Sequence, residues 1–245
     1  MFQSKLVLPQ IEGRSLVFGD IHGQYHKLMS ALKAADFDKQ QDRLLIAGDV
    51  IDRGPDNGKM LKLITKPWVH AVVGNHELMP VLAYELRHSD FTRAWQNLYS
   101  WYMHGGDWFF GGLDAIEKRL KTSTPKKRKK AQFMMMAQLK DLAKHIRKHM
   151  PVSIEFTAQN DQRIGVVHAA VPRFDWQTLD NWNIVKDDYP VWDRDMIKNH
   201  RRHVYNIDAV VMGHTRVPFV LDKGNRIYAD TSGGKEHLKL SFVEF

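Results

Sequence analysis

Short apolar runs alternate with helix-like segments through the first third of the chain. Three of these runs, at 15–18, 44–47 and 70–73, are each followed by a glycine and a polar residue. Apolar residues recur at helical spacing after the first run, over 25–35, and after the second, over 57–65. A strand, a turn and a helix repeated in this way predict βαβ units with a parallel sheet.

The middle of the chain, from about 77 to 150, has a mostly helical pattern. Apolar residues at positions 135, 139, 142 and 146 form one stripe. Thr124-Pro125 suits a helix start and Pro151 a helix stop, which together predict a helix over 125–150. Strands are expected again afterwards, at 152–157, 163–167 and 209–212, near 220 and 227, and at 240–243. The pattern is of the α/β (α+β) class, and without a clear boundary it predicts a single domain over 1–245.

Composition excludes several classes of protein. The chain has 245 residues and no cysteine, which excludes disulfides, thiolate metal ligands and a cysteine nucleophile. It shows no apolar run long enough for a signal peptide or a membrane span, so we expect a cytoplasmic protein with no membrane partner.

The net charge of +8 belongs to one segment. Residues 118–149 carry twelve Lys and Arg side chains and a single acid, Asp141, for a local balance of +11, which leaves −3 for the rest of the chain. We expect a basic helical insertion at about 118–150. A run of this kind is usually a solvated face, and an acidic or nucleic-acid partner at 118–149 is the functional alternative.

Side chains that bind metals follow five of the expected strands. They are Asp20 with His22, Asp49, Asn75, His168 and His214. Carboxylate and amide oxygens mixed with imidazole nitrogens suit Mn, Fe or Zn better than Mg or Ca. Six ligands are too many for one catalytic ion with an open position, and they suit two ions roughly 3.5–4 Å apart that share a carboxylate.

Two further side chains stand beside these ligands in the sequence. Arg53 comes one turn after Asp49, where its guanidinium suits bidentate contact with phosphate oxygens. His76 follows Asn75 directly and supplies a titratable imidazole outside the ligand set. The position of Arg53 therefore indicates contact with a phosphate group.

The ordered blocks resemble the signature of the phosphoprotein phosphatase family of metallophosphoesterases, in particular its bacterial and phage members. The blocks are Gly19-Asp20-Ile21-His22-Gly23, Gly48-Asp49-Val50-Ile51-Asp52-Arg53-Gly54, Gly74-Asn75-His76-Glu77, His168-Ala169-Ala170 and Gly213-His214-Thr215. The likeness continues through 103–110, 191–194 and 228–231, so it covers most of the chain. It implies a calcineurin-like fold, with a central β-sandwich flanked by helices.

The resemblance also implies a role for each residue. One metal would be held by Asp20, His22 and Asp49, and the second by Asp49, Asn75, His168 and His214, with Asp49 bridging. Arg53 and Arg194 would hold the phosphoryl oxygens. His76, oriented by Asp52, would protonate the leaving oxygen.

The function that the resemblance implies is hydrolysis of phosphoserine and phosphothreonine in proteins or peptides, by attack of a metal-bridging hydroxide. Phosphotyrosine stays open as a substrate. The cofactor would be two divalent ions, with manganese favoured and iron or zinc as alternatives.

Two other functions are compatible with the same scaffold. Symmetrical dinucleoside-tetraphosphate hydrolases resemble this chain, but they typically carry alanine in place of Asp52 and aspartate in place of Glu77. A basic nucleic-acid-binding module without catalysis is the second alternative, and the intact set of six ligands argues against it.

Overall fold

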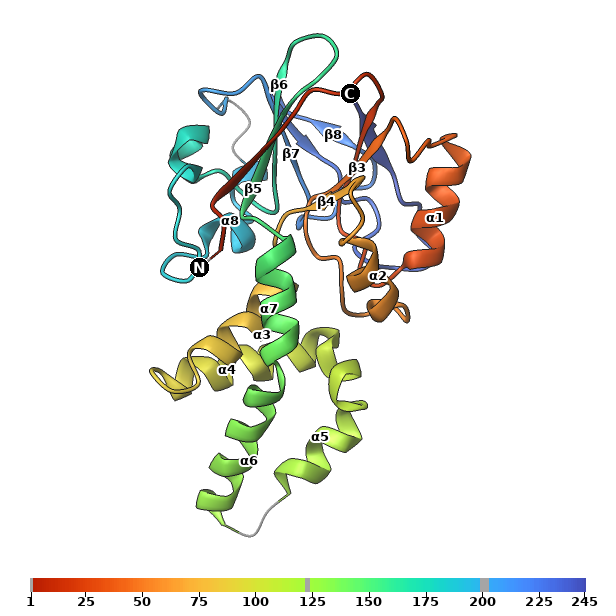
Figure 1. Ribbon diagram of the computed structural model, residues 1–245. Coiled ribbons are helices and arrows are strands. Elements are labelled where there is room, and N and C mark those ends of the chain that lie inside the picture. The colour runs from red at the N-terminus through yellow and green to blue at the C-terminus, as the bar shows by residue number, and fades with distance from the viewer. Residues whose placement is uncertain (1, 122–123, 199–202) are drawn as a thin grey trace. The chain divides into compact units, whose positions relative to one another are not determined.

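The computed structural model describes residues 2–121, 124–198 and 203–245 (Figure 1). The chain forms two compact units, one of residues 1–75 with 149–245 and the other of residues 76–148. We refer to them as the sheet unit and the helical unit. The single catalytic domain over 1–245 stays a prediction.

A four-stranded sheet in the sheet unit contains the predicted parallel repeat. Its strands are β10 (Phe242–Glu244), β2 (Ser15–Phe18), β3 (Arg43–Ile46) and β4 (Val69–Ala71), in that order. The strands β2, β3 and β4 are parallel, and β10 runs antiparallel to β2. Every residue of β2 and β3 is buried, as expected for parallel strands covered on both faces.

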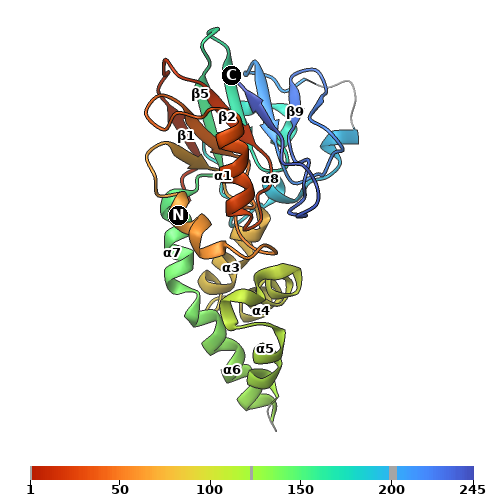
Figure 2. The same ribbon diagram turned by 90° about the vertical axis from the view of Figure 1, so that its right-hand side faces the viewer.

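One helix follows β2 in the chain and another follows β3. They are α1 (Tyr25–Ala34) and α2 (Asn57–Leu63). The predictions for 25–35 and 57–65 are therefore confirmed. Leu28 and Leu32 of α1 are buried, one turn apart on the same helix face. Helix α1 lies beside the four-stranded sheet in both views (Figures 1 and 2).

A six-stranded sheet forms the other layer of the sheet unit. Its strands, in spatial order, are β1 (Lys5–Leu8), β5 (Ser153–Thr157), β6 (Arg163–Val167), β7 (Ala209–Met212), β9 (Arg226–Tyr228) and β8 (Leu221–Asp222). Strands β6, β7 and β9 are parallel neighbours. The short helices η3 (Pro172–Phe174), η4 (Trp176–Leu179), α8 (Tyr189–Trp192) and η5 (Met196–Lys198) connect β6 to β7.

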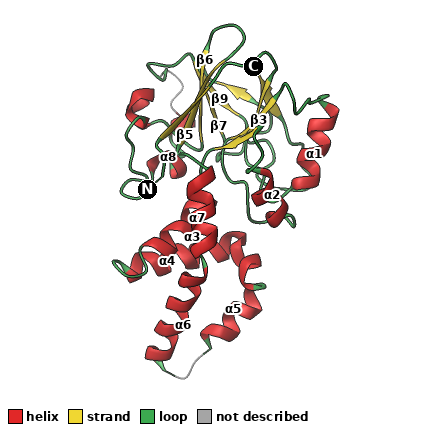
Figure 3. Ribbon diagram, viewed as in Figure 1, coloured by secondary structure: helices red, strands yellow, loops and turns green. Residues whose placement is uncertain are grey.

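The core of the sheet unit lies between the two sheets. Val17 and Leu45 from the four-stranded sheet belong to one cluster with Phe156, Val166 and Val211 from the six-stranded sheet. All five are at most 1% exposed. Strands therefore occupy the middle of the unit, with helices on the outside (Figure 3). This confirms the predicted α/β class and the central sandwich flanked by helices.

The helical unit contains no strand among its described residues. Its elements are α3 (Asn75–Glu85), which begins at the last residue of the sheet unit, α4 (Phe91–Trp101), η1 (Tyr102–Gly106), η2 (Asp107–Phe110), α5 (Leu113–Leu120), α6 (Pro125–Gln138) and α7 (Lys140–His149). Helix α6 packs against α4 and α5. Within the described residues, no helix combines the length and the apolar character that a bilayer crossing needs.

The basic segment forms two helices where the sequence predicts one over 125–150. The predicted start is confirmed, because the Thr124 side chain accepts a hydrogen bond from the Lys127 N–H and Pro125 opens α6. The helical conformation is interrupted at Leu139. This residue ends α6, and its ψ angle is near zero. The stripe of apolar residues survives this break, since Met135, Leu139 and Ile146 are at most 2% exposed. Stripe periodicity alone does not reveal a one-residue interruption.

Candidate metal centre

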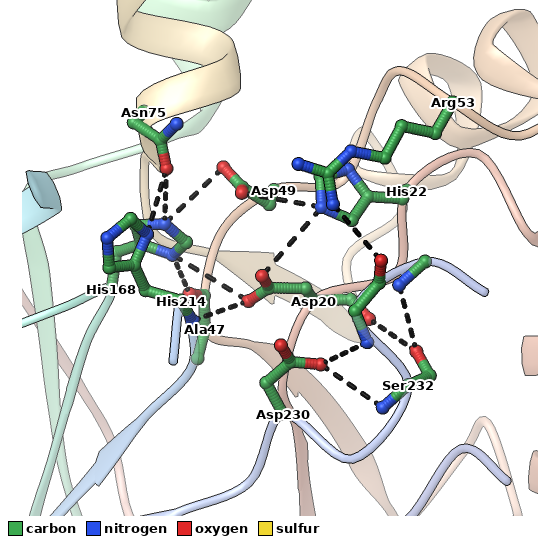
Figure 4. A network of polar contacts seen from close by, with 12 residues as sticks. Asp20, His22, Ala47, Asp49, Arg53, Asn75, His168, His214, Asp230 and Ser232 are labelled. Carbon is green, nitrogen blue, oxygen red and sulfur yellow. Dashed lines mark hydrogen bonds and ion pairs between the residues drawn. The ribbon is translucent and has the colours of Figure 1, made fainter. Parts of the chain in front are cut away.

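The ends of parallel strands bring the six predicted ligands together (Figure 4). Asp20, Asp49 and Asn75 follow β2, β3 and β4, while His168 and His214 follow β6 and β7. His22 lies two residues beyond Asp20. Within each sheet the parallel strands end at the same edge, which brings together Asp20, Asp49 and Asn75 on one sheet and His168 and His214 on the other. All six side chains are buried, with at most 5% of each residue exposed.

The donor atoms lie close to one another around Asp49. The Asn75 Oδ1 is 3.0 Å from His168 Nε2 and 3.1 Å from His214 Nδ1. One Asp49 oxygen, Oδ1, is 3.4 Å from His168 Nε2, and the other, Oδ2, is 3.5 Å from His22 Nε2. The His22 Nε2 is also 3.8 Å from Asp20 Oδ2. Asp49 therefore has one oxygen beside each half of the ligand set, as a bridging carboxylate requires.

Backbone carbonyls fix the orientation of all three histidine rings. The Nδ1–H of His22 donates to the carbonyl of Ile51 (3.0 Å) and the Nδ1–H of His168 to that of Ala47 (2.6 Å). The Nε2–H of His214 donates to the carbonyl of Trp192 (3.3 Å). A carbonyl can only accept, so each ring carries its proton on the side away from the cluster. The nitrogen that faces the cluster is then a lone-pair donor, the form in which imidazole binds a metal.

This donor set fits the dinuclear metal site of metallophosphoesterases. Lone pairs of His168, His214 and Asn75 point at one another across 3.0–3.1 Å, an arrangement that a cation between them stabilises. Burial, followed by the charges of Asp230 and Asp49, raises the pKa of Asp20 well above its usual range. Bound cations would compensate this accumulation of negative charge. One ligand atom each from Asp49, His168 and His214 lies within 4.8 Å of the other two, which is close enough for one ion.

Backbone conformation at the site is unusual. Ten described residues other than glycine have positive φ, and five of them are predicted site residues, with φ of 48–77°: His22, Asp49, Asp52, Arg53 and His214. Such conformations cost free energy, and they persist where the surrounding structure imposes them, often at functional sites. Gly48, with φ of 91°, is required here because a Cβ atom would lie 2.5 Å from His168 Nδ1.

Both residues predicted to contact phosphate are exposed, and their roles stay predictions. The exposed Arg53 donates from Nη1 to the carbonyl of Gly233 (3.1 Å). Its positive charge opposes the rise in the pKa of Asp20, so it acts on the ligand cluster. Arg194 is exposed and comes two residues after Trp192, whose carbonyl binds His214.

The predicted proton donor and its orienting group are both buried. His76 is the second residue of α3 and is 1% exposed, and Asp52 is 0% exposed. The backbone N–H of Asp52 donates to Asn57 Oδ1 (2.6 Å), which fixes the turn that carries Arg53. The structure thus places Asp52 in a rigid turn.

Sequence reasoning missed the contribution of Asp230. This carboxylate is 1% exposed, follows β9 and accepts hydrogen bonds from the backbone N–H groups of Ser232 (3.2 Å) and Gly233 (2.6 Å). Burial raises its pKa. Its charge acts on Asp20, so it supports the cluster from the next strand end. The signal was present, because Asp230 follows the apolar strand near 227 just as the assigned ligands follow theirs.

Comparisons with known proteins agree with this geometry. The family model described as calcineurin-like phosphoesterase matches residues 13–218. A serine/threonine-protein phosphatase 1 of Salmonella typhimurium is 33% identical over 216 residues, which is 88% of this chain and 84% of the relative. A symmetrical bis(5'-nucleosyl)-tetraphosphatase of Edwardsiella ictaluri is 42% identical over only 66 residues, 26% of this chain and 24% of the relative.

The fold is also shared with a solved structure. A protein serine/threonine phosphatase from Saccharomyces cerevisiae has a TM-score of 0.54 and 14% identity, with 100% of this chain and 84% of that chain covered. At this identity the likeness shows the fold alone. The family match spans most of the chain and contains all six ligands, which confirms the resemblance that the sequence blocks indicated. The chain therefore belongs to the calcineurin-like phosphoesterase family, and it is a metallophosphoesterase of the phosphoprotein phosphatase type.

Proposed function

We propose that this protein is a metal-dependent protein phosphatase that hydrolyses phosphoserine and phosphothreonine monoesters. The observation that carries the proposal is the match to a serine/threonine-protein phosphatase along 84% of that relative, together with an intact and buried ligand set. The substrates would be phosphorylated proteins or peptides. We also propose a cytoplasmic location. The 245-residue chain has no cysteine, which suits a reducing compartment.

The six ligands would hold two divalent ions, one on Asp20, His22 and Asp49 and the other on Asp49, Asn75, His168 and His214. When bound, such ions supply an activated water and Lewis acidity toward the phosphoryl group. Imidazole nitrogens mixed with oxygen donors suit manganese, iron or zinc, and manganese is proposed first because the resemblance to bacterial phosphatases implies it. The carbonyls of Ile51 and Ala47 would keep two of the imidazoles in the binding tautomer throughout the reaction.

Arg53 and Arg194 would bind and orient the phosphoryl oxygens. Both side chains are exposed, so their guanidinium groups are accessible to a substrate. A guanidinium can donate two parallel hydrogen bonds to phosphate. These bonds orient the phosphoryl group, and the positive charge stabilises its oxygens. The bond from Arg53 to the Gly233 carbonyl restricts that side chain before substrate arrives.

His76 would donate the proton to the leaving oxygen, and Asp52 would orient it. A serine or threonine alkoxide is a poor leaving group, and an imidazole with an ordinary pKa of about 6.5 is suited to protonate it at neutral pH. Both side chains are buried, which protects this proton transfer from bulk water.

A dinucleoside-tetraphosphate hydrolase is the second candidate function. The 42% identity to a symmetrical tetraphosphatase supports it, although that match covers about a quarter of each chain. Asp52 and Glu77 argue for the protein phosphatase, because the tetraphosphatases typically carry alanine and aspartate at these positions.

A substrate panel separates the two functions. The purified protein is loaded with Mn²⁺, Fe²⁺ or Zn²⁺ and assayed on phosphoserine, phosphothreonine and phosphotyrosine peptides, p-nitrophenyl phosphate and diadenosine tetraphosphate. We expect kcat/KM on the phosphoserine or phosphothreonine peptide to exceed that on diadenosine tetraphosphate by at least about tenfold. Faster hydrolysis of diadenosine tetraphosphate than of every phosphopeptide would overturn the proposal.

A further inference from the structure

The helical unit contains a pocket of about 420 Å³ lined by basic and aromatic side chains. Helix α6 contributes Lys126, Lys129, Lys130 and Phe133. The segment between α3 and α4, with the first residue of α4, contributes Arg87, His88 and Phe91. Folding brings these two segments together from about 40 residues apart in the chain, so the pocket is a property of the folded unit and not of a local basic run.

The pocket is strongly positive. Its lining has four permanent cations, one imidazole and no carboxylate. The acids that neighbour it in sequence have other partners: Glu85 pairs with Arg147 (2.6 Å), and Asp90 accepts from the Arg93 N–H at the start of α4 (3.0 Å). The first turn of α6 has no acid and is cationic, although a helix N-terminus disfavours positive charge. The chain keeps these charges at some cost to its own stability.

Two phenylalanine rings give this positive pocket an apolar part. Phe91 and Phe133 are both half-buried. The ammonium of Lys129 lies 4.9 Å from the centre of the Phe91 ring, and His88 meets Phe133 edge-on with centroids 5.0 Å apart. The lysine stems and these rings can cover an apolar side chain while the charged groups stay in water.

We propose that this pocket docks an acidic segment of the phosphoprotein substrate, with one apolar side chain of that segment seated against Phe91 and Phe133. The inference rests on the proposed function and adds to it a substrate-selecting surface. Charge complementarity indicates an anionic occupant. The two phenylalanine rings indicate that this occupant also carries an apolar group. All seven lining residues belong to the helical unit, and none of them is a predicted metal ligand.

A protein segment fits this pocket better than a nucleic acid does. Single-stranded nucleic acids bind along grooves, with bases stacked on the faces of aromatic rings. Here the charges converge on one pocket of limited volume, and one of the rings, Phe133, meets His88 edge-on instead of forming a stacking platform with it. A pocket of this kind accommodates one side chain flanked by carboxylates.

Binding is tested with the metal-loaded full chain and a labelled, unphosphorylated peptide containing Glu-Glu-Leu-Glu-Glu, by fluorescence anisotropy. The triple variant Lys126→Gln, Lys129→Gln, Lys130→Gln should weaken binding about tenfold, as expected for the loss of three exposed charge contacts. Replacement of the same three lysines by arginine should retain it. The matched control is Lys140→Gln, Lys144→Gln, Lys148→Gln in α7, which removes equal charge outside the pocket and should leave binding unchanged.

The contribution of the two phenylalanine rings is tested by changing the peptide. A peptide with glycine in place of leucine should bind the wild-type protein roughly tenfold more weakly. Equal weakening by both lysine triples would overturn the proposal, because it would mean that binding follows net charge alone. Tighter binding of a single-stranded oligonucleotide through the same three lysines would overturn it in favour of nucleic acid.

Kinetics separate this inference from the proposed function. The acidic segment is joined to a phosphoserine peptide, and its KM is compared with that of the same peptide without the segment. The α6 glutamine triple should raise KM about tenfold for the joined peptide alone, with kcat and p-nitrophenyl phosphate hydrolysis unchanged. If the wild type hydrolyses both peptides with equal KM, docking fails and the phosphatase stands. If neither is hydrolysed but the acidic peptide binds through α6, the proposed function fails and the pocket stands.

Discussion

The sheet unit and the helical unit use charged side chains in opposite ways. Around Asp49 the side chains of the ligand set are buried, come from five strand ends and lie 3.0–3.8 Å from one another, with backbone carbonyls orienting the imidazoles. Around α6 the lysines are exposed and come mostly from one helical turn. The first arrangement depends on the positions of buried atoms, and the second on several exposed charges that line one pocket.

This difference determines how each region responds to change. In a buried site, loss of one carboxylate leaves its neighbours in the wrong charge state and position, so a single substitution has a large effect. On an exposed surface, salt screens each charge, and one charge contributes little. Substitutions in the sheet unit should therefore act singly and strongly, and those in the helical unit should act weakly and together.

The largest effect is expected from Asp49→Asn. The carboxylate oxygens of Asp49 lie between both halves of the ligand set, so the substitution should remove turnover and at least one metal ion, as measured by phosphopeptide assay and elemental analysis. The matched control is Asp42→Asn, another buried carboxylate, which pairs with Arg14 (2.7 Å) and should lower stability but keep both metals. Two tightly held ions and near-normal turnover in the Asp49 variant would contradict the bridging role.

The next effect in size is that of His76→Asn. Both metals should be retained, and turnover on alkyl phosphates should fall by about 10²–10⁴-fold, the range for loss of a general acid. The loss should shrink for p-nitrophenyl phosphate, whose leaving group scarcely needs a proton. His70→Gln is the control, because burial lowers the pKa of His70 to about 4 and the neutral ring is no acid catalyst at pH 7.

The ratio between the two substrates decides the role of His76. Equal losses on alkyl phosphate and p-nitrophenyl phosphate, with metals retained, would show that His76 binds the phosphoryl group. Unchanged turnover on both would remove it from the mechanism.

The two units also differ in how well the sequence predicted them. The ligands Asp20, Asp49 and Asn75 were predictable, because apolar strands that end in glycine and a polar residue must meet at one sheet edge. The carbonyls of Ala47 and Ile51, which orient the imidazoles, were not, because every residue has a carbonyl and only the fold selects one. Asp230 also follows an expected strand, near 227, but its action on Asp20 depends on a burial and a proximity that only the fold reveals.

The helical unit was less predictable. The basic run at 126–130 was plain in the sequence, but its neighbours were not. Arg87 and Phe91 reach the same pocket only because α4 packs against α6, and side-chain periodicity carries no information about which helices pair. The break at Leu139 was missed because it interrupts the helix without interrupting the apolar stripe.

A moderate effect on stability is expected from His70 as pH falls. Burial, followed by the charge of Arg43, lowers the folded-state pKa of His70 from 6.5 to about 4. Between these values the unfolded chain binds a proton that the folded chain does not, so stability falls as pH drops from 6.5 to 4. His70→Gln should reduce this fall by about 2–3 kcal/mol in urea unfolding. An identical slope in wild type and variant would contradict it, and His237→Gln, at an exposed position, is the control.

The smallest effect is expected from the basic run itself. Replacement of Lys126, Lys127, Arg128, Lys129 and Lys130 by glutamine should leave p-nitrophenyl phosphate hydrolysis within about twofold of wild type, because these exposed charges lie outside every catalytic block of the sequence. A collapse of that hydrolysis in a folded variant would show that the segment belongs to the active site.

Two members of the run sharpen this test. Lys127 and Arg128 lie in the same helical turns as the other three but do not line the pocket. If the potential of the whole helix selects substrates, the double variant Lys127→Gln, Arg128→Gln should raise KM for the acidic phosphopeptide in proportion to the charge removed. If the pocket selects them, the double variant should behave as wild type while the triple does not. Both variants are measured at two salt concentrations, because salt screens the general electrostatic attraction of the helix. A difference between the double and triple variants that persists at high salt would show that the positions of the pocket residues matter as well as their total charge.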